Sequence, residues 1–140
     1  VAATALGGGL VSEDGWELAR IRAGVPRFGV DFDVHTYPHE AGLEKTAVSF
    51  QKGCYLGQEV VCMLESRGQI SRRLARLEAD GVIAPGAALL DAAGADVGHV
   101  SSVVTDDAGT HALGLVKRGT LAAGGTLRVG ERHVRLAGAT

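Results

Sequence analysis

The chain has 140 residues, a formal net charge of −2 and 46% hydrophobic residues. This length suits one domain, or one small domain with part of another. The slight negative charge provides no global basic field to attract nucleic acid, so nucleic acid is not an expected partner. No apolar run approaches the ~18 residues of a membrane span, so no membrane partner is expected.

The cysteine count and the N-terminal residues indicate the cellular compartment and the extent of the chain. Two cysteines without a secretory signal segment favour reduced thiols and a cytoplasmic protein. The chain begins with Val1 and already resembles the interior of a domain, so we expect a segment of a longer protein.

The first part of the chain contains signals for a strand and a helix. Residues Val1 to Leu10 are apolar and interrupted by three glycines, which predicts a strand or strand end before a turn. Ser12 can cap a helix with an acidic first turn, and Gly24 followed by Pro26 ends it. The side chains expected to face inward are Trp16, Ala19 and Val25.

The middle of the chain has weaker periodicity. Residues 27–43 read as an ordered loop that carries the acidic pair Asp31 and Asp33. The apolar stretch from Ala47 to Phe50 predicts a short strand. A helix is expected from Gly57 to about Glu65, ended by Arg67 and Gly68.

From Ser71 onward, short Val- and Leu-rich segments recur between glycine turns. Leu127 and Val129 alternate with Arg128, which is the period of a half-buried strand, and Gly130-Glu131 fits a two-residue hairpin loop. About six short strands at regular spacing predict a small antiparallel barrel or sandwich. The expected strands are Arg73–Glu78, Ala87–Asp91, Val97–Thr105, His111–Lys117, Thr126–Val129 and His133–Leu136.

The most informative stretch runs from Lys52 to Glu59. It places Cys54 near two glycines and two residues from a lysine. A nearby cation and a following helix N-terminus both favour the reactive thiolate, which suits a nucleophile, a metal or cluster ligand, or a redox thiol. The alternative for Cys54 is a small buried hydrophobe. Cys62 lies among apolar residues on the expected helix, so a structural role is expected for it.

The sequence does not predict a metal site. The two cysteines are eight residues apart, which matches no common zinc spacing. His35 and His39 are four apart, but Pro38 between them argues against one helical metal-binding face. The remaining histidines lie in separate expected strands and are interpreted as surface or core residues: His99, His111 and His133.

The stretch from Lys52 to Glu59 resembles the signature of the YgfZ family: lysine, glycine, cysteine, tyrosine, any residue, glycine, glutamine, glutamate. These are folate-binding proteins associated with iron–sulfur cluster assembly or repair. They are related to the glycine-cleavage T-protein, an aminomethyltransferase. The flanks agree with the resemblance, which covers the whole chain but is most specific over residues 20–72. The matching flanks are residues 20–26, 28–31 and 38–43, with Arg67, Gly68 and Arg72 after the signature.

The resemblance implies an α+β fold with two parts. Residues 1–68 would be the closing part of a T-protein-like folate-binding domain, and residues 69–140 the C-terminal six-stranded antiparallel β-barrel. It implies tetrahydrofolate or a derivative as cofactor, and iron–sulfur client proteins or assembly factors as partners. Cys54 would be the working thiol. The implied signature and ligand-binding residues are Lys52, Gly53, Tyr55, Gly57, Gln58, Glu59, Glu40, Asp31 and Arg67.

Three departures from the family patterns qualify this implication. Arg22 stands where the T-protein has a glutamate that holds the pterin ring, and Met63 stands where the YgfZ signature usually ends in a basic residue. The half of the T-protein that carries its catalytic aspartate is absent, so the segment alone is not expected to be active. Two alternatives stay open: a folate-dependent aminomethyltransferase, and a non-catalytic interaction module.

Overall fold

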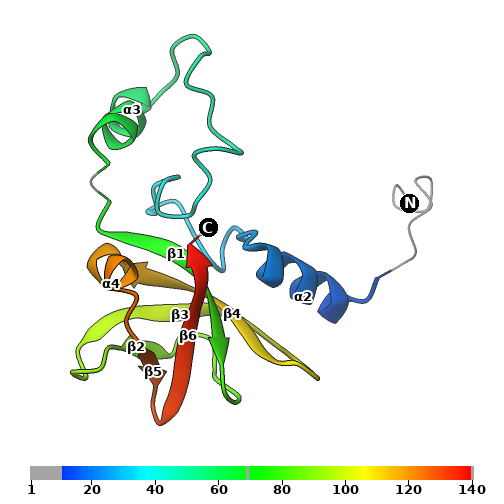
Figure 1. Ribbon diagram of the computed structural model, residues 1–140. Coiled ribbons are helices and arrows are strands. Elements are labelled where there is room, and N and C mark those ends of the chain that lie inside the picture. The colour runs from blue at the N-terminus through cyan, green and yellow to red at the C-terminus, as the bar shows by residue number, and fades with distance from the viewer. Residues whose placement is uncertain (1–10, 69, 140) are drawn as a thin grey trace.

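The computed structural model describes residues 11–68 and 70–139, so the strand expected over Val1 to Leu10 lies outside the described residues. The chain forms a β-barrel preceded by a segment with two helices (Figure 1). The helices are α2 (Glu13–Ala23), α3 (Gln58–Arg67) and α4 (Arg118–Ala123). The strands are β1 (Arg72–Ala79), β2 (Ala88–Leu90), β3 (Asp96–Asp106), β4 (Gly109–Lys117), β5 (Leu127–Val129) and β6 (Arg132–Ala139).

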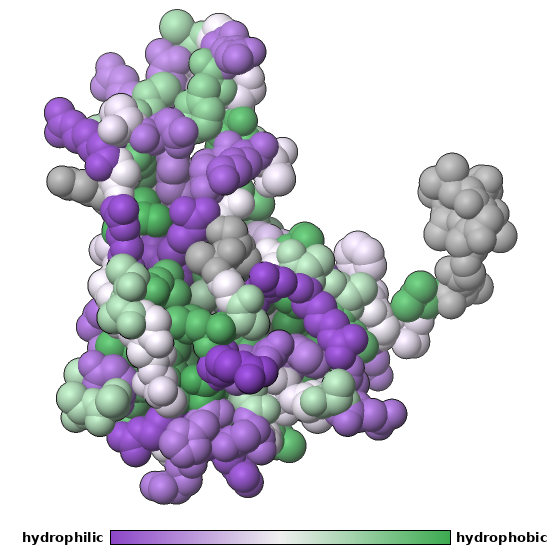
Figure 2. Space-filling model, viewed as in Figure 1, coloured by the Kyte–Doolittle hydropathy of each residue, from purple (hydrophilic) through white to green (hydrophobic). Residues whose placement is uncertain are grey.

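We call residues 11–68 the arm. This segment contains helices α2 and α3 and irregular backbone, and it has none of the barrel strands. Helix α2 contacts β3 and β4, whereas the stretch leading to α3 rises away from the barrel and returns to it at β1 (Figure 1). On the face shown in Figure 2, hydrophobic and hydrophilic side chains are interspersed along this projecting part. The strand expected over Ala47 to Phe50 is wrong, because these residues form turns and irregular backbone.

The barrel confirms the fold expected from the sequence. All six expected strands are present, and they close in the order β1-β4-β3-β2-β5-β6 with antiparallel pairing throughout. Gly130 forms the β5–β6 turn with a positive φ of 56°. Gly98 permits close approach of β3 and β4, because an added Cβ would lie 2.0 Å from the carbonyl oxygen of Leu115. The short helix α4 between β4 and β5 was not expected.

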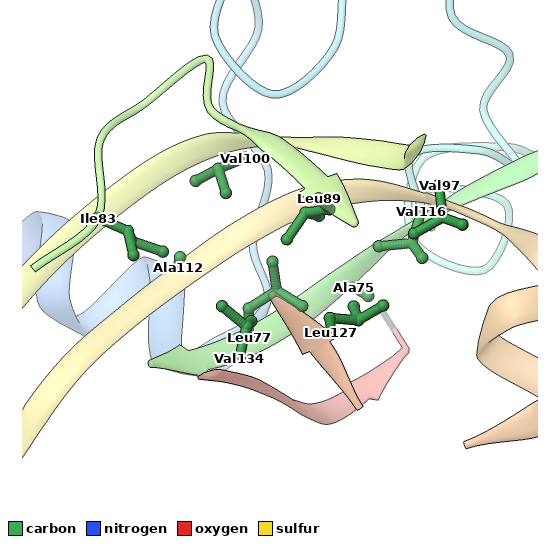
Figure 3. Close-up of a cluster of buried hydrophobic side chains, with 10 residues drawn as sticks. All are labelled: Ala75, Leu77, Ile83, Leu89, Val97, Val100, Ala112, Val116, Leu127 and Val134. Atoms are coloured by element: carbon green, nitrogen blue, oxygen red, sulfur yellow. The ribbon is translucent and has the colours of Figure 1, made fainter. Parts of the chain in front are cut away.

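The hydrophobic core lies inside the barrel. Ten buried side chains from the strands and the loop after β1 form one cluster (Figure 3). Leu77, Leu89 and Leu127 are fully buried within it. A smaller cluster joins Ile21 of α2 to barrel residues Leu74, Leu113 and Leu115. The barrel therefore has a core of its own, and α2 adds one aliphatic side chain to its outer face.

Helix α2 has the ends that its sequence predicts. The Ser12 hydroxyl accepts a hydrogen bond from the Gly15 amide at 3.1 Å, and Gly24 ends the helix with a φ of 73°. The expectation for its buried face was wrong: Trp16 is 61% exposed, Val25 is 50% exposed, and Ala19 is also exposed. Arg20 and Ile21 are buried instead. The Arg20 guanidinium forms hydrogen bonds to Asp31 and to Ser102 of β3, and Ile21 packs against the barrel.

Candidate functional site

The residues Lys52 to Glu59, which we call the signature turn, lead directly into α3. The Gln58 side chain accepts a hydrogen bond from the Tyr55 amide at 3.3 Å, and the Gln58 amide donates to the Tyr55 carbonyl at the same distance. Gly57 precedes the helix with a φ of 84°, a conformation that L side chains rarely adopt. These contacts and this glycine fix where α3 begins, as the sequence predicted.

Lys52 and Tyr55 form a cation–π pair in the signature turn. The Lys52 Nζ lies 4.9 Å from the centroid of the Tyr55 ring. The Tyr55 hydroxyl is buried and has no hydrogen-bond partner among the described residues. An unsatisfied buried hydroxyl is unusual and requires an explanation, such as a group that it meets in the working protein.

The thiol of Cys54 is exposed and free. The interpretation of Cys54 as a buried hydrophobe is therefore wrong, and the side chain is accessible to a reagent or partner. Cys62 is exposed too, on α3, so it does not occupy the apolar environment that its neighbours suggested. The Lys52 ammonium, which was expected to act on Cys54, lies over the Tyr55 ring.

The other signature residues lie on the surface of the arm. An added Cβ at Gly53 would meet nothing within 4 Å, and its φ is not in the left-handed range, so this chain's own packing does not require glycine there. Glu59 and Arg67 are exposed in the first and last turns of α3. Their charges suit those helix ends, because the dipole favours an acid near the N-terminus and a base near the C-terminus.

Asp31 lies apart from these exposed residues, in a buried network between arm and barrel. Its carboxylate accepts from the Arg20 guanidinium at 2.7 Å, the Arg27 amide at 2.9 Å and the Ser101 hydroxyl. Arg20 also donates to the Ser102 hydroxyl at 2.7 Å. The side chains of Arg20, Asp31, Ser101 and Ser102 are all buried, and their hydrogen bonds join α2 and the loop after it to β3.

Arg20 also bonds Glu17, one turn earlier on α2. This hydrogen bond is the largest cause that holds the pKa of Glu17 below its ordinary value. Burial tends to lower the pKa of Arg20, but its bonds with Glu17 and Asp31 outweigh burial and raise it. The three-residue spacing of Glu17 and Arg20 was the one local signal for this network.

Glu40 joins the arm to the start of the barrel. Its buried carboxylate accepts from Arg72 Nε at 3.1 Å and from the Tyr37 amide at 3.2 Å. Its carbonyl accepts from the Leu74 amide at 2.6 Å. The structure thus brings Lys52, Tyr55 and Gln58 together in the signature turn, whereas Asp31 and Glu40 lie where the arm meets the barrel.

Arg22, the residue that departs from the T-protein pattern, faces the barrel. Its guanidinium lies 2.6 Å from the Asp106 carboxylate and 3.0 Å from His111 Nε2. Burial tends to raise the pKa of Asp106, but the Ala108 amide and the positive charge of Arg22 outweigh it, so the pKa lies below its ordinary value. The Arg22 guanidinium is thus paired with barrel side chains.

Residues 11–68 and 70–139 contain neither a cluster of metal-binding side chains nor a helix that could span a membrane. Within them, no group of three His, Cys, Asp or Glu side chains is placed to hold a metal ion. Over the same ranges, none of the helices combines the length and the apolar character required to span a membrane.

Sequence comparisons connect this geometry to known proteins. Residues 72–139 match the family model described as the CAF17 C-terminal beta-barrel domain. A chloroplastic protein of Arabidopsis thaliana is 32% identical over 118 residues, which are 83% of this chain and 27% of that protein. The mitochondrial iron–sulfur cluster assembly factor IBA57 homologue of Chaetomium globosum is 39% identical over 64 residues, 44% of this chain and 15% of that protein.

A third relative and a solved structure complete the comparison. The tRNA-modifying protein YgfZ of Colwellia psychrerythraea is 36% identical over 64 residues, 45% of this chain and 20% of that protein. The crystal structure of the glycine cleavage system aminomethyltransferase T of Bartonella henselae matches with a TM-score of 0.72 at 23% identity. That match covers 84% of this chain and 35% of the other, and it shows the fold alone.

The matched regions thus span 27% or less of the three relatives. Residues 72–139 form a closed β-barrel that matches the CAF17 C-terminal beta-barrel model, and the chain is similar in sequence to the YgfZ and IBA57 proteins and has the fold of the aminomethyltransferase T-protein.

Proposed function

We propose that this chain is part of a tetrahydrofolate-dependent factor for iron–sulfur cluster assembly or repair, with Cys54 as its working thiol. The observation that carries the proposal is the exposed, free Cys54 within the signature turn. The names of the IBA57 and YgfZ relatives support the functional class. The proposal includes a cytoplasmic location and a division into a folate-binding part, residues 1–68, and a barrel part, residues 69–140.

The signature turn has groups that suit a folate. Tetrahydrofolate would supply a carrier for a one-carbon unit. Its aromatic portion would stack on the Tyr55 ring, and its glutamate carboxylates would pair with the Lys52 ammonium, which already lies 4.9 Å from that ring. The unsatisfied Tyr55 hydroxyl supports a polar ligand nearby. Arg22 does not fit the pterin role of the T-protein glutamate, because Asp106 and His111 hold it.

The remaining signature residues would have supporting roles. Gly53 would allow close approach of a ligand or partner, since nothing lies within 4 Å of a Cβ built there. Gly57 and Gln58 would set the backbone of the turn, and Glu59 and Arg67 would contact a partner from the exposed surface of α3. Asp31 and Glu40 would act indirectly, by holding the arm on the barrel.

Two names among the relatives are compatible with this function. The YgfZ relative is named for tRNA modification and the IBA57 relative for iron–sulfur cluster assembly. A factor that maintains iron–sulfur enzymes satisfies both names if a tRNA-modifying enzyme is among its clients. Direct contact with tRNA is not favoured, because the chain's net charge is −2.

An aminomethyltransferase is the second candidate. The match to the T-protein fold, with a TM-score of 0.72, favours it. Cys54 counts against it, because a catalytic thiol is not part of one-carbon transfer by the T-protein. The third candidate, a non-catalytic interaction module, is favoured by the fully exposed Leu56 beside Cys54.

The test is a rescue experiment with the complete open reading frame, in cells that lack their own YgfZ-type factor. The readout is the activity of an iron–sulfur enzyme that has fallen in those cells. We expect rescue by the parent and by Cys62→Ala, and loss of rescue with Cys54→Ala. Cys62 is the matched control, because its thiol is also free and exposed on the arm.

The other outcomes separate the candidates. Rescue by both cysteine variants would retain the maintenance function but reduce Cys54 to a structural residue. No rescue by the parent, although it accumulates as folded protein, would contradict the maintenance function and favour folate-dependent transfer.

A further inference from the structure

A cavity lies between the arm and the barrel. Its volume is about 510 Å³, and we call it the arm–barrel cavity. Its wall combines the segment before the signature turn, the C-terminal half of α3, and the barrel residues near the starts of β1 and α4. The residues that matter here are His39, Glu44, Lys45, Phe50, Leu64 and Arg118.

Two polar side chains of this cavity have an atom with no partner. Glu44 is 8% exposed; one carboxylate oxygen accepts from Arg73 at 2.6 Å, and the other is buried without a partner in the described chain. His39 is 6% exposed; Nε2 lies 3.1 Å from a Glu65 oxygen, and the buried Nδ1 likewise has no partner. Two unsatisfied atoms in one cavity wall are costly and indicate a missing group.

The chemistry of these atoms defines the missing group. The free Glu44 oxygen is an acceptor. Since His39 Nε2 faces a carboxylate, it carries the proton in the neutral ring, which leaves Nδ1 as an acceptor too. A group with several N–H donors, such as an ammonium or an amidine, would satisfy both.

The rest of the cavity wall suits other parts of the missing molecule, namely an anionic end and an apolar middle. Lys45 and Arg118 are exposed, and neither forms an ion pair with a carboxylate in the part of the chain that the structure describes. Arg118 does donate to the Gly68 carbonyl. Phe50 and Leu64 provide an aromatic and an aliphatic surface in the same wall. The cations suit an anion, and the apolar surface suits a hydrocarbon body.

We propose that the arm–barrel cavity binds a small amphoteric molecule: a cationic amine or amidine at Glu44 and His39, an apolar body against Phe50 and Leu64, and a carboxylate at Lys45 and Arg118. Because the two acceptor atoms are shielded from solvent, side chains of the wall shift when the donor arrives. This site does not use the signature turn, so it does not rest on the proposed folate function.

The test uses three probes and nuclear magnetic resonance of the full 140-residue chain. para-(Aminomethyl)benzoate carries both charged ends on one ring, para-toluate lacks the amine, and benzylamine lacks the carboxylate. We expect saturable shifts of the Glu44, Phe50 and Arg118 amide signals with para-(aminomethyl)benzoate, in the millimolar range that suits about eleven non-hydrogen atoms. Each of the other two probes binds more weakly.

Substitutions distinguish a built site from a general perturbation. Glu44→Gln weakens the two amine probes roughly tenfold or more but leaves para-toluate unchanged. Lys45→Gln weakens the two carboxylate probes about threefold but leaves benzylamine unchanged. Arg128→Gln, a cation on β5 outside the cavity wall, changes none of them.

Three results would overturn the proposal: no saturable shifts, shifts that map outside the cavity wall, or equal weakening of all three probes in both variants. Lys45 is exposed, so its substitution tests the carboxylate end even if Glu44→Gln does not fold.

Discussion

Two of the ion pairs that connect helix α2 to its surroundings differ mainly in burial. Arg20 and Asp31 lie 2.7 Å apart with side chains 3% and 0% exposed, and Arg22 and Asp106 lie 2.6 Å apart with side chains 45% and 22% exposed. Asp31→Asn and Asp106→Asn therefore make the same chemical change at nearly the same distance. The comparison isolates the effect of burial.

The buried substitution should be far more costly. The Asp31 carboxylate accepts three hydrogen bonds, from Arg20, from the Arg27 amide and from Ser101. An asparagine amide presents a donor to at least one of these donors, and the Arg20 charge then has only the more exposed Glu17 carboxylate as its counterion among the described residues. Breaking a buried pair in this way costs about 3 to 5 kcal/mol, whereas an exposed pair is screened by water and contributes little.

The assay is urea unfolding followed by two signals. Far-UV circular dichroism reports the whole chain, and fluorescence reports α2, because Trp16 is the single tryptophan and lies on that helix. With a slope of about 1.5 to 2 kcal/mol per molar urea, we expect Asp31→Asn to lower the midpoint by roughly 2 M. The double variant Arg20→Met with Asp31→Leu should recover part of the loss, because it removes the buried Arg20 charge together with its buried partner.

The reasoning fails if Asp31→Asn and Asp106→Asn shift the midpoint by the same amount. It also fails if the double variant is less stable than Asp31→Asn alone.

Two further predictions concern the signature turn and acid stability. Gly57→Ala should destabilise the turn by about 1 kcal/mol, because φ is 84° there, whereas Gly53→Ala should be neutral; amide exchange of α3 measures both, and equal effects would contradict the backbone argument. Stability should fall as the pH drops below about 4.5, because the folded-state pKa of Glu17 is lowered by Arg20 and the unfolded chain therefore binds its proton first. Urea titrations across acidic pH should show a shallower decline for Glu17→Gln, and an unchanged slope would refute this assignment.

The barrel could be predicted because its signals are local. Alternation places Leu127 and Val134 in the core while Arg135 stays exposed, and glycine marks the turn between these strands. The helix ends followed equally from Ser12 and Gly24. Helix α4 was missed because six residues provide too short a window for a helical period.

The buried face of α2 shows what sequence reasoning could not supply. Periodicity favoured Trp16 as the inward residue. In the structure, Ser102 accepts a hydrogen bond from Arg20, and Ser101 donates one to Asp31 in the loop after α2. Ser102 lies 82 positions after Arg20 in the sequence. A buried arginine is favourable only with such partners, and their positions depend on the closed barrel. The same limit applies to the candidate site: the signature turn was readable as a segment, whereas the Lys52–Tyr55 pair was not.

The structure also distinguishes residues that attach the arm to the barrel from residues of the arm whose side chains are exposed. Of the twelve large hydrophobic side chains exposed in the described ranges, eleven belong to the arm and one, Val82, to the barrel region. The arm therefore has little core of its own, and buried polar contacts such as Arg20–Asp31 and Glu40–Arg72 attach it to the barrel. Because Cys54 lies on this arm, substitutions there can change activity while the barrel core stays intact, whereas substitutions at Asp31 or Glu40 would alter activity by moving the arm. A loss of function at Asp31 or Glu40 accompanied by a loss of stability is thus no evidence for ligand contact, whereas a loss at Cys54 with unchanged stability is.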